Sequence, residues 1–362
     1  MNMHDSKILE ADFQEEDALI INTCCITREA ERQCRQKIRK LARDNPDKKI
    51  YVTGCSSALH PEYYAAYTVL PRVDASKPKH VDFDSRVRAF IPIQTGCDNA
   101  CTYCIVPSVR GKAKHFPEET ILKQIDYALS AGVIEIVLTG IDLASYPDLS
   151  QLIRKILSSF PTLLRLRFGS FDPARITDDF IALFKNEPRL MPHLHLSLQH
   201  ASDPILKRMR RRHLSDDVSK AIRKLRVIRP DMVFGADIIT GFPTETDADF
   251  DFLCQFVKEN NIALLHVFPY SERPGTPAAL MPSVPVPTRK ARAKTLRGIS
   301  QELKNTLYQT YINKDAIVLL EEGGFGYTET YLPVNISTDL ENTLVRVKIT
   351  GIQKGELVGG IL

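Results

Sequence analysis

The chain has 362 residues and a net charge of +4, so it is too long for one ordinary domain and long enough for two or three. Hydrophobic residues make up 43% and charged residues 25%, a composition typical of globular proteins and not of disordered chains. No run of about 18 apolar residues occurs, which excludes a membrane span, and we expect no membrane partner.

Two apolar runs near the N-terminus, 18–22 and 49–53, predict strands that flank a helix over 29–42. This is the pattern of a small α/β unit. Residues 71–84 are rich in proline and charge, so we expect a linker there.

Six short apolar runs alternate with amphipathic stretches in the middle of the chain. The runs cover residues 89–93, 135–139, 164–168, 193–198, 232–239 and 264–268. Helical periodicity lies between them, at 118–130, 149–160, 216–227 and 247–260. Six successive β-α units predict a parallel sheet or a partial barrel, because a closed barrel of this kind has about eight.

Three prolines within residues 282–287 mark a boundary, and a basic helix is expected over 289–307. Alternating strands with Gly-rich turns then follow, at 316–320, 331–334, 344–349 and 356–361, and predict a small β-barrel. The expected fold is an α/β protein with a partial (βα)6 barrel between two smaller domains. The expected domains are residues 1–85, 86–300 and 301–362.

The strongest chemical signal is a cysteine triplet, Cys97, Cys101 and Cys104, directly after the first expected barrel strand. The N-terminus lacks the pattern of an export signal, so we expect a reducing, cytoplasmic setting in which clustered thiols favour metal or redox chemistry. A structural zinc site usually has four protein ligands. A [4Fe–4S] cluster held by three cysteines instead leaves one iron free to bind a small molecule. A zinc loop or unligated buried cysteines are the alternatives.

This C-x3-C-x2-C spacing, at the end of a strand in a β-α barrel, resembles the radical S-adenosylmethionine (SAM) superfamily. The resemblance implies that Cys97, Cys101 and Cys104 hold a [4Fe–4S] cluster whose free iron binds SAM. It also implies that SAM is cleaved to a 5′-deoxyadenosyl radical and that the ring of Tyr103 packs near its adenine.

Further stretches are similar to the methylthiotransferase family, which replaces a C–H bond by C–SCH3. They cover residues 22–24, 53–55, 93–97, 104–111, 137–142, 193–199, 206–213 and 237–246. The similarity implies an auxiliary [4Fe–4S] cluster that supplies the sulfur, with Cys24 and Cys55 as two of its three ligands. It also implies that the C-terminal barrel is an RNA-binding TRAM domain.

The substrate depends on the branch of this family. The run His-Val-Phe-Pro-Tyr-Ser-Glu-Arg-Pro-Gly-Thr at 266–276 looks most like the branch that methylthiolates carbon 2 of N6-threonylcarbamoyladenosine at tRNA position 37. The alternatives within the family are isopentenyladenosine at the same position and an aspartate of a ribosomal protein. A non-catalytic RNA-binding protein with a structural metal site is the alternative from another class.

The third auxiliary ligand is missing from its expected motif. In the family it lies in a Gly-Cys-x-x-Asn run, and Asn2 matches the asparagine, which puts the cysteine before Met1. The first strand of the Rossmann-like N-terminal domain would fall there too, so we expect this domain to be truncated and the native protein to extend upstream. The alternative is that Cys25 or Cys34 serves as ligand. Cys25 should point away from Cys24 if the strand continues, and Cys34 lies on the expected helix.

Polar residues at the C-terminal ends of barrel strands are commonly ligand contacts. The expected SAM contacts are Tyr103, Gly140, Asp142, Ser170, Gln199 and Asp237. For Gly140 and Asp142, an ordinary turn with an acidic helix cap is the alternative.

Basic charge is concentrated in the middle of the chain, where residues 86–300 carry 30 basic and 22 acidic side chains. The densest run includes Arg210, Arg211 and Arg212, which we expect to contact tRNA phosphates. A solvated helix face and contact with SAM are the alternatives. The expected partners are the anticodon loop of a tRNA, a reducing electron donor and a sulfur source.

Overall fold

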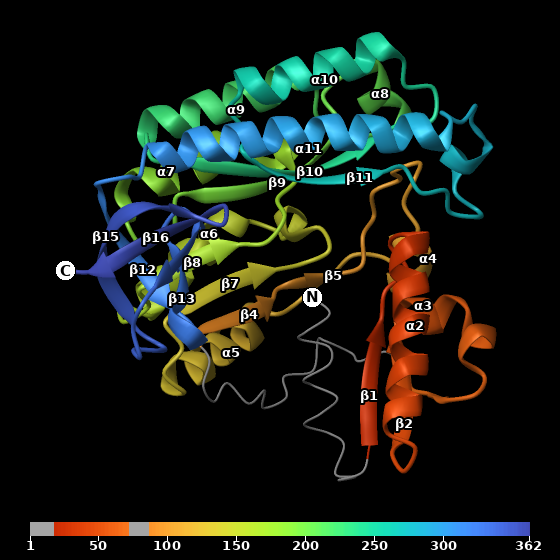
Figure 1. Cartoon of the computed structure of the whole chain (residues 1–362), viewed down its shortest axis with the longest axis horizontal. Helices are drawn as coiled ribbons and strands as arrows, with labels where there is room; N and C mark the ends of the chain where they lie inside the picture. Colours follow the sequence, from red (N-terminus) through yellow and green to blue (C-terminus); the bar gives the residue numbers. More distant parts are fainter. Residues whose placement is uncertain (1–17, 72–86) are drawn as a thin grey trace.

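The computed structural model describes residues 18–71 and 87–362. They form a small α/β unit on the right of Figure 1, a partial barrel in the centre and a small closed β-barrel on the left. The expected linker over 71–84 lies, except for its first residue, outside the described residues.

The N-terminal unit is a three-stranded parallel sheet in the order β1-β2-β3. Its strands are β1 (Ala18–Thr23), β2 (Lys49–Gly54) and β3 (Thr68–Val69), and its helices are α2 (Arg28–Asp44), α3 (Cys55–Leu59) and a 3-10 turn at Pro61–Tyr64. The Thr27 hydroxyl caps α2 by accepting a hydrogen bond from the Ala30 N–H at 3.0 Å. Thr23 and Gly54 are paired in register, so the cysteine that follows each of them begins at the same sheet edge.

Six parallel strands build the central part, as the alternating pattern predicts. They are β4 (Arg88–Pro92), β7 (Glu135–Thr139), β8 (Arg165–Phe168), β9 (His193–Gln199), β10 (Val233–Thr240) and β11 (Leu264–Pro269). Their sheets, β4-β7-β8 and β9-β10-β11, are joined by isolated bridges at Leu166–Leu190 and Phe171–Leu196. Within the described residues, β4 and β11 are the two free edges, so the barrel is open between them.

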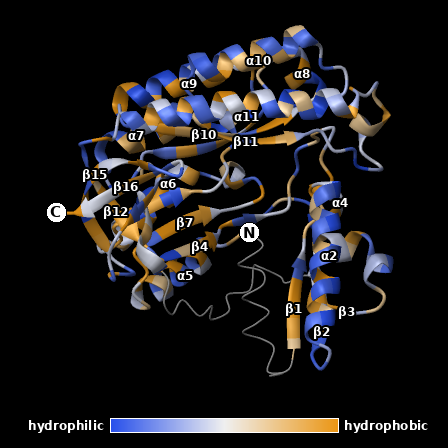
Figure 2. Cartoon of the chain, in the orientation of Figure 1, coloured by the Kyte–Doolittle hydropathy of each residue, from blue (hydrophilic) through white to orange (hydrophobic). Residues whose placement is uncertain are grey.

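Helices cover the outside of the six strands (Figure 1). They are α5 (Glu118–Ser130), α6 (Leu149–Ser159), α7 (Asp178–Asn186), α8 (Asp203–Arg208), α9 (Ser215–Ile228), α10 (Asp247–Glu259) and α11 (Val286–Gln309). Shorter elements are the hairpin β5 (Gln94–Thr95) and β6 (Lys114–His115), helix α4 (Val106–Arg110), and 3-10 turns at Leu143–Ser145, Pro173–Arg175 and Pro277–Leu280. Figure 2 shows that the central strands are mostly apolar and that the helices around them carry both polar and apolar residues. Amphipathic helices cover a core in this way. In the described part of the chain, no helix is long and apolar enough to cross a bilayer.

The C-terminal part is a closed five-stranded barrel, which confirms the small β-barrel expected there. Its strands are β12 (Asp315–Leu320), β13 (Phe325–Thr328), β14 (Pro333–Ile336), β15 (Leu344–Gln353) and β16 (Glu356–Ile361), with a 3-10 turn at Glu322–Gly324. The sequence pattern missed β13, because its glycine and two aromatic residues do not alternate in polarity. Residue 300, the expected domain boundary, lies within α11, which runs on to the small barrel.

A fully buried carboxylate lies where the two barrels meet. Glu135 of β7 forms salt bridges with Arg88 and, at 2.7 Å, with Arg167. Burial alone would raise the pKa of Glu135, but these two guanidinium groups hold it below its ordinary value. Arg167 also donates to the Thr328 carbonyl at 2.8 Å, so the same charge cluster ties the central strands to the small barrel.

We expect Glu135→Gln to lower the free energy of unfolding by about 3–5 kcal/mol, because the nearly isosteric amide leaves the buried Arg167 without its counter-charge and leaves Arg88 with Glu321 alone. Urea unfolding followed by circular dichroism measures this loss. The matched control is Glu119→Gln, since Glu119 pairs with Lys123 on the surface with 77% of its side chain exposed. Equal effects of the two variants would contradict the stabilising role of the buried cluster.

Candidate functional site

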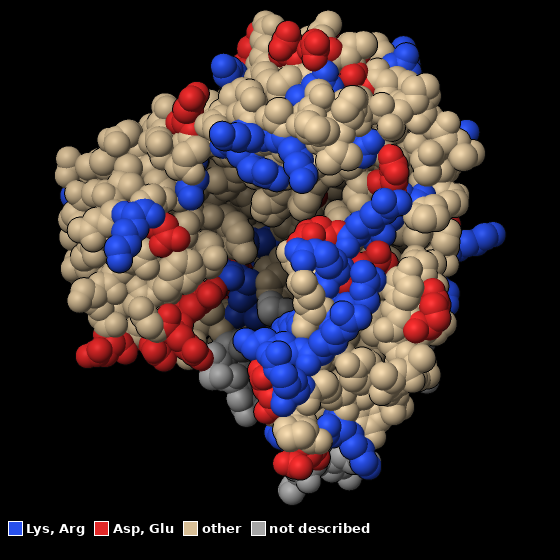
Figure 3. Space-filling view, turned by 45° about the vertical axis from the view of Figure 1, so that its right-hand side comes forward, with Lys and Arg blue, Asp and Glu red and all other residues tan. Residues whose placement is uncertain are grey.

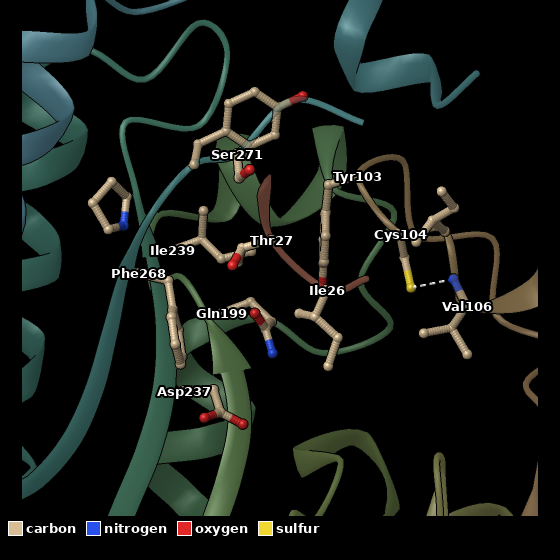
Figure 4. Close-up of a pocket in the computed structure, with 13 residues that line it drawn as sticks. Ile26, Thr27, Tyr103, Cys104, Val106, Gln199, Asp237, Ile239, Phe268 and Ser271 are labelled. Atoms are coloured by element: carbon tan, nitrogen blue, oxygen red, sulfur yellow. Dashed lines mark hydrogen bonds between the residues drawn. The ribbon is translucent and has the colours of Figure 1, made fainter. Parts of the chain in front are cut away.

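The cysteine triplet lies on the loop between β5 and α4, with all three side chains partly buried. The Asn99 N–H donates to Cys97 Sγ at 3.4 Å. The Val106 N–H donates to Cys104 Sγ at the same distance (Figure 4). Burial raises the pKa of the Cys97 thiol, and it raises that of Cys104 to about 11. Neighbouring sulfur atoms with N–H donors aimed at them fit the ligands of an iron–sulfur cluster. Such a cluster binds thiolates, so its binding displaces the thiol protons of the cysteines.

Backbone contacts hold this loop in place. Gly96 has φ +71°, and a Cβ on it would collide with the Lys112 carbonyl, so this tight approach requires glycine. On the far side of the loop, the Thr102 N–H donates to the Met209 carbonyl at 3.1 Å and its hydroxyl donates to the Arg208 carbonyl at 2.8 Å. The arginine-rich run after α8 therefore supports the cysteine loop.

The three arginines of this run lie in different surroundings. Arg211 has 7% of its side chain exposed, lies 3.2 Å from Asp172, and directs Nη1 to Cys101 Sγ at 3.6 Å. Arg212, with 38% of its side chain exposed, forms salt bridges with Asp142 at 3.5 Å and Asp172 at 3.1 Å, and Arg210 is exposed. The buried guanidinium of Arg211 thus lies against the cysteine loop and away from solvent, a position that does not suit contact with RNA phosphates.

A cavity of about 300 Å³ opens beside Cys104 (Figure 4). Of the expected SAM contacts, Tyr103, Gln199 and Asp237 line it, and the Ser170 hydroxyl lies 3.4 Å from Asp237 Oδ2. The sequence expectation and the structure thus bring four of the six residues to one place.

Gly140 and Asp142 do not line this cavity, although they lie near the cysteine loop. Asp142 accepts a hydrogen bond from the Asn99 amide at 2.9 Å, and its backbone N–H donates to Gln94 Oε1 at 2.9 Å. Burial, with a smaller contribution from Asp172, raises the pKa of Asp142. The Asp142 carboxylate therefore lies beside Cys97, where it can accept a hydrogen bond from a molecule bound at the cysteine loop.

Several cavity residues were not predicted from the sequence. Ile26 and Thr27 of the N-terminal unit line the cavity, as do Phe268 and Ser271 at the end of β11. No local pattern marks these residues, because packing between distant parts of the chain brings them together. The N-terminal unit therefore supplies part of the cavity wall next to Cys104.

Four further cysteines gather at the end of the N-terminal sheet. The Cys24 N–H lies 3.5 Å from Cys34 Sγ, and the Cys25 and Cys55 thiols interact directly. The condition under which Cys25 would point away from Cys24, a strand that continues through both residues, does not apply, because β1 ends at Thr23. Burial raises the pKa of the Cys24 thiol, and contact with Cys55 together with burial raises that of Cys25. Asn2 and the motif around it lie outside the described residues.

Two arginines connect these cysteines to the central part. Arg110, at the end of α4, donates to Cys55 Sγ at 3.1 Å. Arg273, with 4% of its side chain exposed, donates to the Cys25 carbonyl, to the Ile26 carbonyl at 3.3 Å and to Glu31 at 2.8 Å. The loop after β11 thereby holds the end of β1 against the cavity.

Basic side chains surround a hollow in the face that Figure 3 shows, where the side carrying α2 comes forward. Helix α2 alone contains seven Lys and Arg residues, and residues 18–71 hold nine basic against five acidic side chains. Counted over residues 1–85, which hold 13 basic and 14 acidic side chains, the N-terminal segment is slightly acidic, whereas its described part at 18–71 is basic. This surface attracts polyanions.

Comparisons with known proteins agree with this arrangement. The model of the Radical SAM superfamily matches residues 91–257, and that of uncharacterized protein family UPF0004 matches residues 1–70. A radical S-adenosylmethionine methyltransferase, TsrM from Kitasatospora setae, has a similar fold, with a TM-score of 0.53, 12% identity, and coverage of 75% of this chain and 68% of that chain.

Similar sequences cover nearly the whole chain. The threonylcarbamoyladenosine tRNA methylthiotransferase MtaB of Rickettsia prowazekii is 38% identical, over 98% of this chain and 94% of that protein. MtaB of Bacillus subtilis is 32% identical, over 93% and 86%. The tRNA-2-methylthio-N(6)-dimethylallyladenosine synthase of Dictyoglomus thermophilum is 31% identical, over 97% and 91%.

We expect Arg273→Gln to loosen the N-terminal unit, because Glu31 and two backbone carbonyls lose a buried partner. Hydrogen–deuterium exchange should become faster over residues 24–31 and stay unchanged in β9 and β10. Arg32→Gln is the control in the same unit, since Arg32 pairs with Glu29 on the surface. Unchanged exchange over residues 24–31 would show that Arg273 does not hold the two parts together.

Proposed function

The chain belongs to the radical SAM methylthiotransferase family, and on this premise we propose that it methylthiolates carbon 2 of N6-threonylcarbamoyladenosine at position 37 of tRNA. The relative in Rickettsia prowazekii carries threonylcarbamoyladenosine in its name and aligns over nearly the full length of both chains. Dimethylallyladenosine synthases are also similar, but the one from Dictyoglomus thermophilum is 31% identical, against 38% for the Rickettsia prowazekii protein. The run at 266–276 supports the same choice of substrate.

One structural observation carries this proposal. Cys104 of the triplet lines the same cavity as Ile26 and Thr27, which directly follow Cys24 and Cys25. A methylthiolation needs a radical and a sulfur donor at one carbon atom, so two cysteine groups beside one cavity are what the reaction requires.

Carbon 2 of adenine carries an unactivated hydrogen that a side-chain base does not remove at neutral pH. When bound, SAM and the cluster on Cys97, Cys101 and Cys104 supply the radical that abstracts it. The protein residues orient and shield: Tyr103 and Phe268 offer aromatic surface to adenine rings, and Arg211 donates toward the Cys101 sulfur. Of the expected SAM contacts, we assign Gln199, Asp237 and Ser170 to the cavity, and Gly140 and Asp142 to the side of Cys97.

We propose a second [4Fe–4S] cluster at Cys24 and Cys55, with sulfur supplied by an external source. Cys25 and Cys34, which lie beside them, are the candidates for a third ligand among the described residues. In this assignment residues 1–85 form a Rossmann-like domain, residues 86–300 the radical SAM core and residues 301–362 a TRAM-like domain.

The RNA partner is assigned from charge and exposure. We place tRNA phosphates along the basic face of α2 and at Arg210, and we assign Arg211 and Arg212 to the cysteine loop and its carboxylates. Long-range attraction to RNA is strongest on such a surface and falls with salt. We also propose that an external reducing donor supplies the electron and that the protein works in the cytoplasm.

Iron content separates the two proposed clusters. Anaerobically reconstituted protein should hold about eight irons per chain, and Cys55→Ala should hold about four while still cleaving SAM. Cys101→Ala should lose SAM cleavage. Cys254→Ala, on α10 and away from both groups, is the control and should keep the full iron content. Zinc in place of iron, or SAM cleavage by the Cys101 variant, would refute the cluster assignment.

The substrate is tested by deleting the gene and profiling tRNA nucleosides by mass spectrometry. We expect the 2-methylthio form of N6-threonylcarbamoyladenosine to disappear and its precursor to accumulate. Complementation with the unaltered gene, but not with the Cys101→Ala gene, should restore it. Loss of 2-methylthio-isopentenyladenosine instead would assign the chain to the other tRNA branch.

A further inference from the structure

A carboxylate between two histidines lies at the edge of the cavity. Asp237 of β10 lines the cavity, and its Oδ1 accepts from His195 Nε2 of β9 at 3.1 Å and from His266 Nδ1 of β11 at 3.3 Å. The two imidazole rings are 4.5 Å apart, and Asp237 is paired with His266 in register. Gly235 leaves room for this row, because a Cβ there would collide with the His195 ring.

Exposure rises along this row toward the free edge of the sheet. The side chains of His195, Asp237 and His266 are 13%, 23% and 65% exposed, because β11 is the edge strand. The hydrogen bond that His266 donates to Asp237 raises the pKa of His266, which favours its imidazolium form. With Nδ1 engaged, the second ring N–H of His266 is the donor left for a ligand, and no described residue accepts a hydrogen bond from it.

The neighbouring cavity wall is apolar and carries no other cation. Ile239 and Phe268 are paired two residues further along β10 and β11, on the same face as Asp237 and His266, and both line the cavity. None of the described residues that line it is Lys or Arg. In Figure 4, Gln199, Phe268 and Asp237 lie around one space, so a planar ring held there lies close to the histidine row.

We propose that His266, held by Asp237 and His195, binds the threonine carboxylate of the N6 substituent and so selects the substrate. This inference rests on the proposed function and identifies the residue that distinguishes its substrate. Carbon 2 and the carbon that bears N6 are both bonded to ring nitrogen 1, so the substituent lies near the reacting atom. A dimethylallyl substituent has no charge at this place and gains nothing from an imidazolium.

The same three side chains also suggest a metal site, since one ligand atom of each lies within 4.8 Å of the others. Both imidazoles, however, lie within 3.3 Å of the same carboxylate oxygen, a distance at which each ring can donate an N–H to it. A metal would need the lone pairs of these nitrogens instead. We therefore assign the row to an anionic group of the substrate, and metal content becomes an outcome of the test.

The experiment compares two anticodon stem–loop RNAs with the reconstituted enzyme. One carries N6-threonylcarbamoyladenosine at position 37, and the other carries the methyl ester of its carboxylate, which removes the charge. We expect the wild-type protein to bind the acid about 10- to 100-fold more tightly than the ester, as a charge-assisted hydrogen bond implies. Equilibrium binding is measured by fluorescence anisotropy, and kcat/KM is measured in parallel.

Variants then test whether His266 is the residue that distinguishes the acid from the ester. His266→Gln keeps a hydrogen-bond donor without the charge, so the ratio of acid to ester should fall toward one. His266→Lys should restore a preference for the acid. His115→Gln, on the exposed strand β6, is the matched control and should keep the wild-type ratio.

Each contrary result has a distinct meaning. Equal binding of acid and ester by the wild type, or an equal loss for both RNAs in His266→Gln, would overturn this inference alone. Stoichiometric zinc that is lost in His195→Gln would replace it by a metal site. Turnover of a dimethylallyladenosine RNA without turnover of the threonylcarbamoyl RNA would overturn the proposed substrate and this inference with it.

Discussion

The guanidinium group of Arg273 is the contact on which the geometry of the site depends. It reaches from the loop after β11 to the Cys25 and Ile26 carbonyls and to the buried carboxylate of Glu31. These acceptors belong to the segment that ends β1 and begins α2, so one buried side chain fixes the position of the N-terminal cysteines relative to the cavity. A planar group with five donors suits this task, since it can satisfy several acceptors at once.

Much of this arrangement follows from local sequence patterns. Six apolar runs predict the six strands, and the spacing of Cys97, Cys101 and Cys104 predicts a loop that binds a cluster, because both signals depend on neighbours along the chain. The place of Ile26 in the cavity and the partners of Arg273 could not be predicted in this way. They depend on docking between segments more than 240 residues apart, for which one sequence offers no periodic signal. The contact between Cys25 and Cys55 likewise depends on how the chain turns after β1, which the local pattern does not specify.

The net charge counted along the sequence also differs from the charge that the folded surface presents. Counted over residues 1–85, the N-terminal segment is slightly acidic, yet α2 presents a dense row of basic side chains. In the arginine run at 210–212, burial instead removes charge from the surface, because Arg211 packs against the cysteine loop. Net charge along the sequence therefore does not show which basic side chains reach solvent, and only the folded surface separates arginines that face solvent from those that neutralise carboxylates.

The contact between Arg273 and Ile26 also sets an order of events during synthesis, because the two residues are 247 positions apart. At about 5–20 residues per second, a ribosome needs roughly 12–50 s to add Arg273 after Ile26. Throughout this interval the N-terminal thiols exist without the wall that later covers them. The N-terminal cysteines are therefore synthesised well before Arg273, so this end of the molecule reaches its final geometry only after most of the chain has been made.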